Sequence, residues 1–271
     1  MTHDPIFDSS SMRHGEEEDA SSDWEGRVTR PSVELLSAAL ALVAWWFVSA
    51  VYLFVRIGGE GVSQLGDSRV AKDPATRQWE LVVLIESQLF AQSAVLAAIA
   101  ILRPDSASFG RSPIRTAVIG YAIILPLWLG LGALSISAAR YLQLEVPART
   151  DLLEFLSGDV GGSSWILVAI QVVIVGPLFE EFLFRKFLLD GLREWTGNVR
   201  ALITSSVLFG LMHFDAGFHA VPPLIFLGLA FGILRMKSGG LLAPILAHSL
   251  HNAVMIAWVV IEGSKQGYRF S

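Results

Sequence analysis

Long apolar stretches limit this chain more than any other feature of its sequence. About 20 helical residues cross a hydrocarbon layer about 30 Å thick, and every backbone polar group inside that layer needs a partner. We therefore predict an all-α, polytopic membrane bundle of about six to eight transmembrane helices. The predicted helices cover residues 33–55, 81–102, 114–136, 165–192, 201–214, 222–234 and 241–261.

Composition and charge agree with this fold class. Hydrophobic residues make up 53% of the chain and charged residues only 17%. The net charge of -5 resides in residues 1–31, which hold 8 acidic and 3 basic side chains. The rest of the chain is neutral and shows no basic stripe that could bind phosphates, so we expect no nucleic-acid partner. The absence of cysteine excludes disulfides, thiolate metal sites and a cysteine nucleophile.

Composition divides the chain into four parts. Residues 1–31 are predicted to be a disordered acidic cytoplasmic tail, and residues 32–163 to hold the N-terminal transmembrane helices and loops. Residues 164–262 carry the polar motifs described next, and residues 263–271 are a short C-terminal tail. A cytoplasmic N-terminus is predicted because this orientation leaves more Lys and Arg on the cytoplasmic side.

One group of ionisable residues lies inside an apolar stretch, where each costs about 2.5–3.5 kcal/mol and is a functional candidate. Glu181 and Arg185 are one helical turn apart and can pair, which leaves Glu180 free to face elsewhere. The alternative is a helix that crosses the membrane interface. In that case the pair only stabilises the helix and Glu180 is solvated.

Two further groups follow along the chain. Phe209 and His213 are one turn apart near the end of an apolar helix, where a lone histidine is more often structural than catalytic. His248 and Asn252 share one face of the last predicted helix. The alternative for these side chains is that they only join helices through hydrogen bonds.

In combination, the three groups contain what peptide hydrolysis requires, namely a base for water and donors for the oxyanion. Glu180 would be the base, and His213 would position the water or donate a hydrogen bond. His248 and Asn252 would form the oxyanion site. A zinc mechanism would use Glu180, His213 and His248 as metal ligands, and the residues alone leave both mechanisms open.

The order of these groups resembles the CPBP intramembrane proteases, which include CAAX prenyl endopeptidases and bacterial bacteriocin-processing or self-immunity relatives. The EExxxR, FxxxH and HxxxN/D motifs of that family are similar to residues 180–185, 209–213 and 248–252. The resemblance covers residues 164–262 and implies an all-helical bundle whose catalytic pocket opens inside the membrane. It also implies the cytoplasmic membrane of a prokaryote. Supporting roles fall to Glu181, Arg185 and Phe209.

The predicted function is an intramembrane endopeptidase that cleaves a membrane-associated protein or peptide; a prenylated or a leader-bearing substrate would fit. A glutamate-activated water without a cofactor is favoured, with zinc as the alternative.

The alternative function is a non-catalytic membrane scaffold or bacteriocin self-immunity protein of the same family. A transporter that carries protons on Glu86 and Glu180 is disfavoured, because the sequence lacks two related halves with broken helices. Membrane lipid and the substrate are the expected partners, and the oligomeric state is left open.

Overall fold

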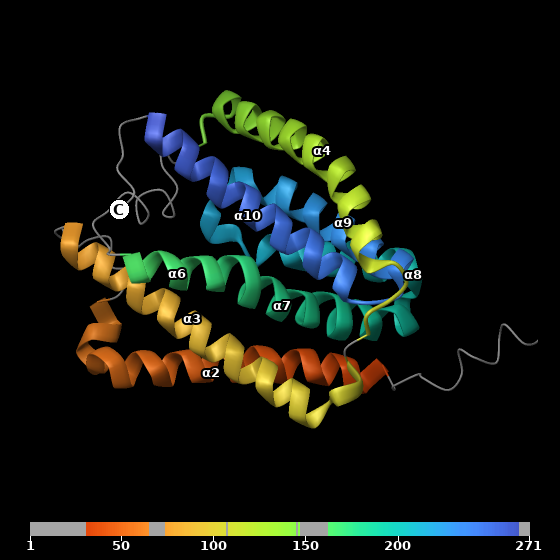
Figure 1. The fold of residues 1–271 in the computed structure, drawn as a ribbon, viewed down its shortest axis with the longest axis horizontal. Coiled ribbons are helices and arrows are strands. Elements are labelled where there is room, and N and C mark those ends of the chain that lie inside the picture. The colour runs from red at the N-terminus through yellow and green to blue at the C-terminus, as the bar shows by residue number, and fades with distance from the viewer. Residues whose placement is uncertain (1–30, 65–73, 107, 145, 147–161, 266–271) are drawn as a thin grey trace, which may run out of the picture.

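The structure, a computed structural model, is a bundle of helices (Figure 1). It describes residues 31–64, 74–106, 108–144, 146 and 162–265, and no strand occurs among these residues. Six helical segments within them are long and apolar enough to cross a membrane, which confirms the predicted fold class. Except for Pro31, the predicted acidic tail lies outside the described residues.

The N-terminal half of the bundle contains three long helices. These are α2 (Pro31–Gln64), α3 (Pro74–Leu102) and α4 (Pro113–Tyr141). α2 and α3 pack side by side as an antiparallel pair, joined by hydrogen bonds from Trp45 Nε1 to Gln88 and from the Tyr52 hydroxyl to Glu86. Polar contacts of this kind hold helices together where water cannot compete for them.

The C-terminal half is built from α6 (Gly162–Ile170), α7 (Gly176–Glu181), α8 (Asp190–Leu211), α9 (Val221–Ser238) and α10 (Leu242–Lys265). Two π-helical stretches, η2 (Gln171–Val175) and η3 (Phe182–Leu189), connect α6, α7 and α8 without a break. Short 3₁₀ turns, η4 (Phe214–Ala216) and η5 (Phe218–Ala220), lead from α8 into α9.

The predicted helix over residues 165–192 contains Pro177, where a helix often breaks, and the structure continues it through that residue. Gly176 keeps helical dihedral angles (φ -57°, ψ -58°), and its N–H bonds to the carbonyl of Gln171, five residues back. Proline lacks an N–H and crowds the preceding turn, so a widened turn before it accommodates the ring. The break in direction comes later, at Gly197, where φ is 78° and α8 divides into two rods.

An ion-pair network ties several helices together at the end of the bundle where α2 begins. Glu34 accepts hydrogen bonds from Arg103 at 2.9 Å and Lys186 at 3.3 Å. Asp190 pairs with Arg235 at 2.8 Å. Basic side chains from η3, α9 and the residue after α3 therefore meet acidic ones from α2 and α8, which fixes the start of α2 against the C-terminal half.

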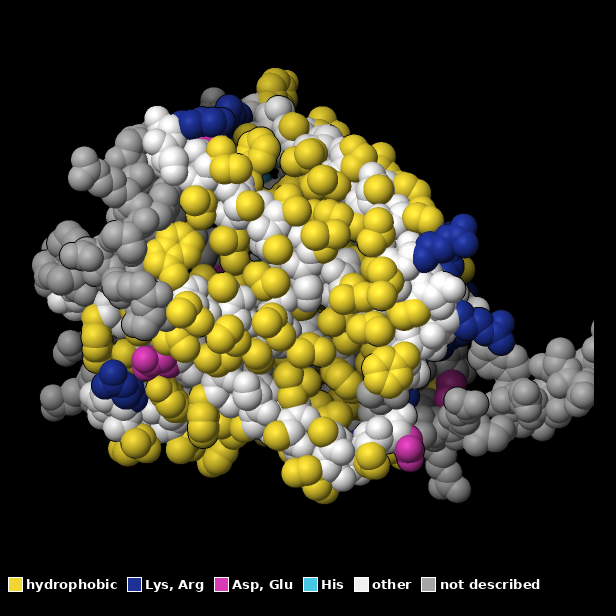
Figure 2. Space-filling model, viewed as in Figure 1, with side chains coloured by type: hydrophobic (Ala, Val, Ile, Leu, Met, Phe, Trp, Pro, Cys, Tyr) yellow, Lys and Arg dark blue, Asp and Glu magenta, His cyan; other side chains and the backbone are white. Residues whose placement is uncertain are grey.

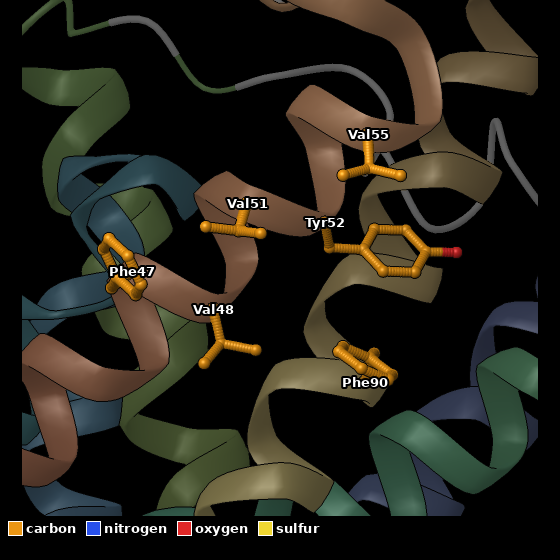
Figure 3. Close-up of a pocket in the computed structure, with 6 residues that line it drawn as sticks. All are labelled: Phe47, Val48, Val51, Tyr52, Val55 and Phe90. Atoms are coloured by element: carbon orange, nitrogen blue, oxygen red, sulfur yellow. The ribbon is translucent and has the colours of Figure 1, made fainter.

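The outer surface of the bundle is apolar, as contact with lipid requires. Hydrophobic side chains cover most of the face shown in Figure 2, and Lys and Arg lie at its margins. A groove of about 290 Å³ runs along α2 and α3 on this outer surface (Figure 3). It is lined by Phe47, Val48, Val51, Tyr52, Val55 and Phe90, none of which is a predicted site residue.

Candidate active site

Three of the predicted site residues converge from different helices. Glu180 comes from the last turn of α7, His213 follows α8, and His248 lies in α10. The Glu180 Oε2 atom lies 3.8 Å from Nε2 of His213 and 3.8 Å from Nε2 of His248. This oxygen is buried and accepts no hydrogen bond from the described residues. A small donor such as water is the partner that this arrangement suits.

His213 is held by its own helix end. Its Nδ1 lies 2.9 Å from the carbonyl oxygen of Phe209, one turn earlier. A carbonyl only accepts hydrogen bonds, so Nδ1 carries the proton. In the neutral ring, Nε2 then presents a lone pair toward Glu180, which allows His213 to accept a hydrogen bond from water.

His248 is oriented by Glu181 rather than by its own helix. The His248 Nδ1 atom donates to Glu181 Oε1 at 2.9 Å, and Glu181 Oε2 lies 3.1 Å from Arg185 Nε. The side chains of Glu181 and Arg185 are 0% and 2% exposed, so both charges are removed from solvent. The structure thus links the EExxxR segment to the third motif through one carboxylate.

Aromatic rings complete the surroundings of Arg185 and His248. The Arg185 guanidinium lies 4.5 Å from the centre of the Phe209 ring and donates to the carbonyl oxygen of Gly228 at 3.3 Å. The His248 ring stacks on Phe231 with 4.8 Å between centroids and 24° between planes. Cation–π and stacking contacts of this kind hold both side chains in one orientation.

Asn252 binds a backbone carbonyl that the widened turn leaves free. Its Nδ2 donates to the carbonyl oxygen of Val172 at 2.8 Å. In a π-helix that carbonyl would bond to residue 177, which is a proline without an N–H, while the Gly176 N–H is taken by Gln171. An amide nitrogen has two hydrogens, so Asn252 keeps one donor for a further partner.

Some components of the site gave no signal in the sequence. Phe231 is one apolar residue in an apolar helix, and the Val172 carbonyl is a backbone group, so neither could be found from residue type. Gln171, a polar residue in an apolar stretch next to Val172, was detectable but was not singled out.

The described residues contain no group of three or more His, Asp or Glu side chains arranged to hold a metal ion. If a zinc ion were bound, its ligands would be Glu180, His213 and His248, because these side chains face one another. Zinc in such a site would lower the pKa of a bound water and polarise the scissile carbonyl. The choice between a metal-free and a zinc mechanism stays a prediction.

Comparison with known proteins shows which family the site is similar to. Residues 162–254, which include all the predicted site residues, match the model of the type II CAAX prenyl endopeptidase Rce1-like family. The putative membrane peptidase YdiL of Bacillus subtilis is 33% identical over 140 residues, which are 47% of this chain and 57% of the relative. The membrane-embedded CAAX protease MroQ of Staphylococcus aureus is 31% identical over 97 residues, covering 34% and 38%.

A eukaryotic relative also matches. CAAX prenyl protease 2 of Rattus norvegicus is 29% identical over 136 residues, which are 48% of this chain and 42% of the relative. The chain thus spans about half the length of the curated relatives it matches, and no solved structure matches it. The resemblance to the CPBP family is confirmed by these matches.

Proposed function

We propose that this protein is an intramembrane endopeptidase that hydrolyses a peptide bond of a membrane-associated protein or peptide, using a water activated by Glu180. The observation that carries this proposal is the position of Glu180 Oε2. It is buried, it has no hydrogen-bond donor among the described residues, and it lies 3.8 Å from the Nε2 atoms of two histidines. A water in this space can donate to Glu180 and to His213 at once.

The reaction would proceed by general base catalysis. Glu180 takes a proton from the water, and the resulting hydroxide attacks the scissile carbonyl carbon. The oxyanion accepts hydrogen bonds from the second Nδ2 hydrogen of Asn252 and from an Nε2–H of His248. Glu181 accepts the hydrogen bond from Nδ1 and so keeps Nε2 directed at the site. Glu180 then delivers its proton to the leaving nitrogen as the C–N bond breaks.

The experiment that tests the proposed function compares membranes from cells that carry either the unmodified protein or Glu180→Gln. New protein N-termini are labelled and identified by mass spectrometry. We expect at least one cleavage that requires the unmodified protein and is absent with Glu180→Gln. Identical sets of N-termini in the two membranes would contradict the proposal and would favour a scaffold without catalytic activity.

We propose a cytoplasmic membrane location with the N-terminus in the cytoplasm. The end of the bundle where α2 begins holds the basic side chains of Arg103, Lys186 and Arg235. Because the cytoplasmic ends of membrane proteins carry an excess of basic residues, this end is assigned to the cytoplasm. The α10 end at Lys265 lies at the opposite end of the bundle (Figure 1).

The chain contains no cysteine, so a single introduced cysteine is the one thiol that a labelling reagent can modify, and this tests the orientation. Asp105 and Lys265 are both exposed and lie near opposite ends of the bundle. We expect a membrane-impermeant maleimide to label Lys265→Cys in intact spheroplasts and to label Asp105→Cys only after permeabilisation. The reverse labelling pattern would show that the N-terminus faces the outside.

The reaction is proposed to need no metal ion, because Glu180, His213 and His248 can supply the base and the hydrogen bonds directly. We expect purified protein to contain less than about 0.1 zinc ions per chain by elemental analysis, and a chelator to leave turnover unchanged. Stoichiometric zinc that is required for turnover would show instead that the same three side chains bind the metal.

A further inference from the structure

The Gln171 side chain in η2 has a fixed orientation and an unused oxygen. Its Nε2 donates to Gln92 Oε1 of α3 at 2.9 Å. Its Oε1 is buried and accepts no hydrogen bond from the described residues. A buried amide oxygen without a donor is costly, and such groups in folded proteins call for an explanation by water, ligand or catalytic role.

Gly176 lies next to both this amide and the proposed catalytic base. A Cβ placed on Gly176 would lie 3.8 Å from Gln171 Nε2 and 3.9 Å from Glu180 Oε1, so both side chains border the same space. The same Cβ would lie only 2.9 Å from the carbonyl oxygen of Gln171. Glycine thus avoids a clash with the widened turn at a position that lies next to both the amide and the carboxylate.

Two consecutive residues of η2 thus carry polar groups beside the site. The carbonyl of Val172 holds Asn252, the proposed oxyanion donor. The side chain of Gln171 next to it has a buried acceptor without a donor, and its amide nitrogen borders the same space as Glu180. π-Helical turns are often found at functional sites. The partner that fixes Gln171 comes from α3, outside the segment that matches the family model.

A peptide substrate supplies the group that this acceptor lacks. Each residue of an extended peptide brings a backbone N–H, and inside the membrane an N–H without a partner costs several kcal/mol. We propose that Gln171, held by Gln92, binds the substrate backbone: its Oε1 accepts a hydrogen bond from an N–H next to the bond that is cleaved. This inference rests on the proposed function and assigns the N-terminal helices a part in substrate binding.

The test uses a peptide of about ten residues that spans a cleavage site found by the membrane comparison, carrying a fluorophore and a quencher. Gln171→Met keeps the side-chain volume but removes the acceptor. We expect KM to rise about five- to tenfold with kcat changed less than about twofold, as for an interaction made equally in the ground and transition states. The matched control is Gln88→Met, because Gln88 lies one turn from Gln92 and its amide oxygen accepts a hydrogen bond from Trp45. The KM of Gln88→Met should equal that of the unmodified protein.

A set of peptides with single ester bonds identifies the N–H that Gln171 binds. Each ester replaces one backbone N–H by oxygen. With the unmodified protein, we expect one ester peptide to lose about five- to tenfold in kcat/KM relative to the amide peptide. Gln171→Met should cleave the ester and amide peptides equally well. If the role of Gln171 were only structural, Gln171→Met would show the same loss with the ester peptide as the unmodified protein.

The outcomes separate this inference from the proposed function. If Gln171→Met is as sensitive as the unmodified protein to every ester, the oxygen binds only water and the inference is overturned while the protease remains. If Gln171→Met has an unchanged KM, the inference is likewise overturned. If the membrane comparison yields no cleavage that depends on Glu180, the proposed function fails and this inference fails with it.

Discussion

Glu181→Gln is expected to lower the free energy of unfolding by about 3–5 kcal/mol, because it leaves a buried positive charge without its partner. The Arg185 side chain is buried, and its Nε lies 3.1 Å from Glu181 Oε2. Its other short contacts among the described residues are with aromatic rings and one backbone carbonyl, which carry no charge. Glu180 also attracts it electrostatically, but less strongly than Glu181 does. Thermal unfolding in detergent micelles measures the loss.

Two matched variants show whether charge is the cause. Glu181→Gln combined with Arg185→Met removes both buried charges, and we expect it to be more stable than Glu181→Gln alone. Glu262→Gln removes a carboxylate from an exposed pair with Lys265 and should cost less than about 1 kcal/mol. Unchanged stability of Glu181→Gln together with complete loss of cleavage would reverse the roles given to Glu180 and Glu181.

Glu180→Gln has the largest expected effect on activity. An amide has the shape of the carboxylate but cannot take a proton from water, so we expect cleavage to fall at least about a thousandfold. Stability should change little, because Glu180 Oε2 accepts no hydrogen bond from the described residues and its histidine neighbours are 3.8 Å away. Initial rates and thermal unfolding of the same purified samples measure both quantities.

Glu86→Gln provides the control for a glutamate in a membrane helix that lies outside the site. Glu86 accepts a hydrogen bond from Tyr52 at 3.1 Å and lies 3.6 Å from Arg56, between α2 and α3. Its loss should leave the rate of cleavage unchanged. If both glutamates were needed for activity, proton transfer through the membrane would have to be considered in place of hydrolysis at one carboxylate.

The helical bundle could be predicted from the sequence because the membrane allows few alternatives. Segments such as 33–55 and 241–261 are long and apolar, and the one proline in them, Pro244, lies in the first turn of its helix; the structure forms helices over both. The path around Pro177 was harder to predict. A proline signals a disturbed helix, but whether the chain bends or widens by one residue depends on its neighbours, here Gly176 and the Gln171 carbonyl.

The side chains at the centre of the site could be named from the sequence, whereas their partners across helices could not. Spacing along one helix predicts a contact between Glu181 and Arg185, and the structure places them 3.1 Å apart. The contact of Glu181 with His248 joins residues 67 positions apart in the chain, which spacing on one helix does not reveal. For the same reason the binding of Asn252 to Val172 depends on the three-dimensional packing of α10 against η2.

The catalytic role of Glu180 is the central claim, and one comparison of rates tests it most directly. Purified unmodified protein and Glu180→Gln are placed in vesicles at equal amounts of folded protein, with the fluorogenic peptide described above. We expect rapid cleavage by the unmodified protein and a rate at least about a thousandfold lower for Glu180→Gln. Equal rates for the two proteins would contradict the proposed mechanism.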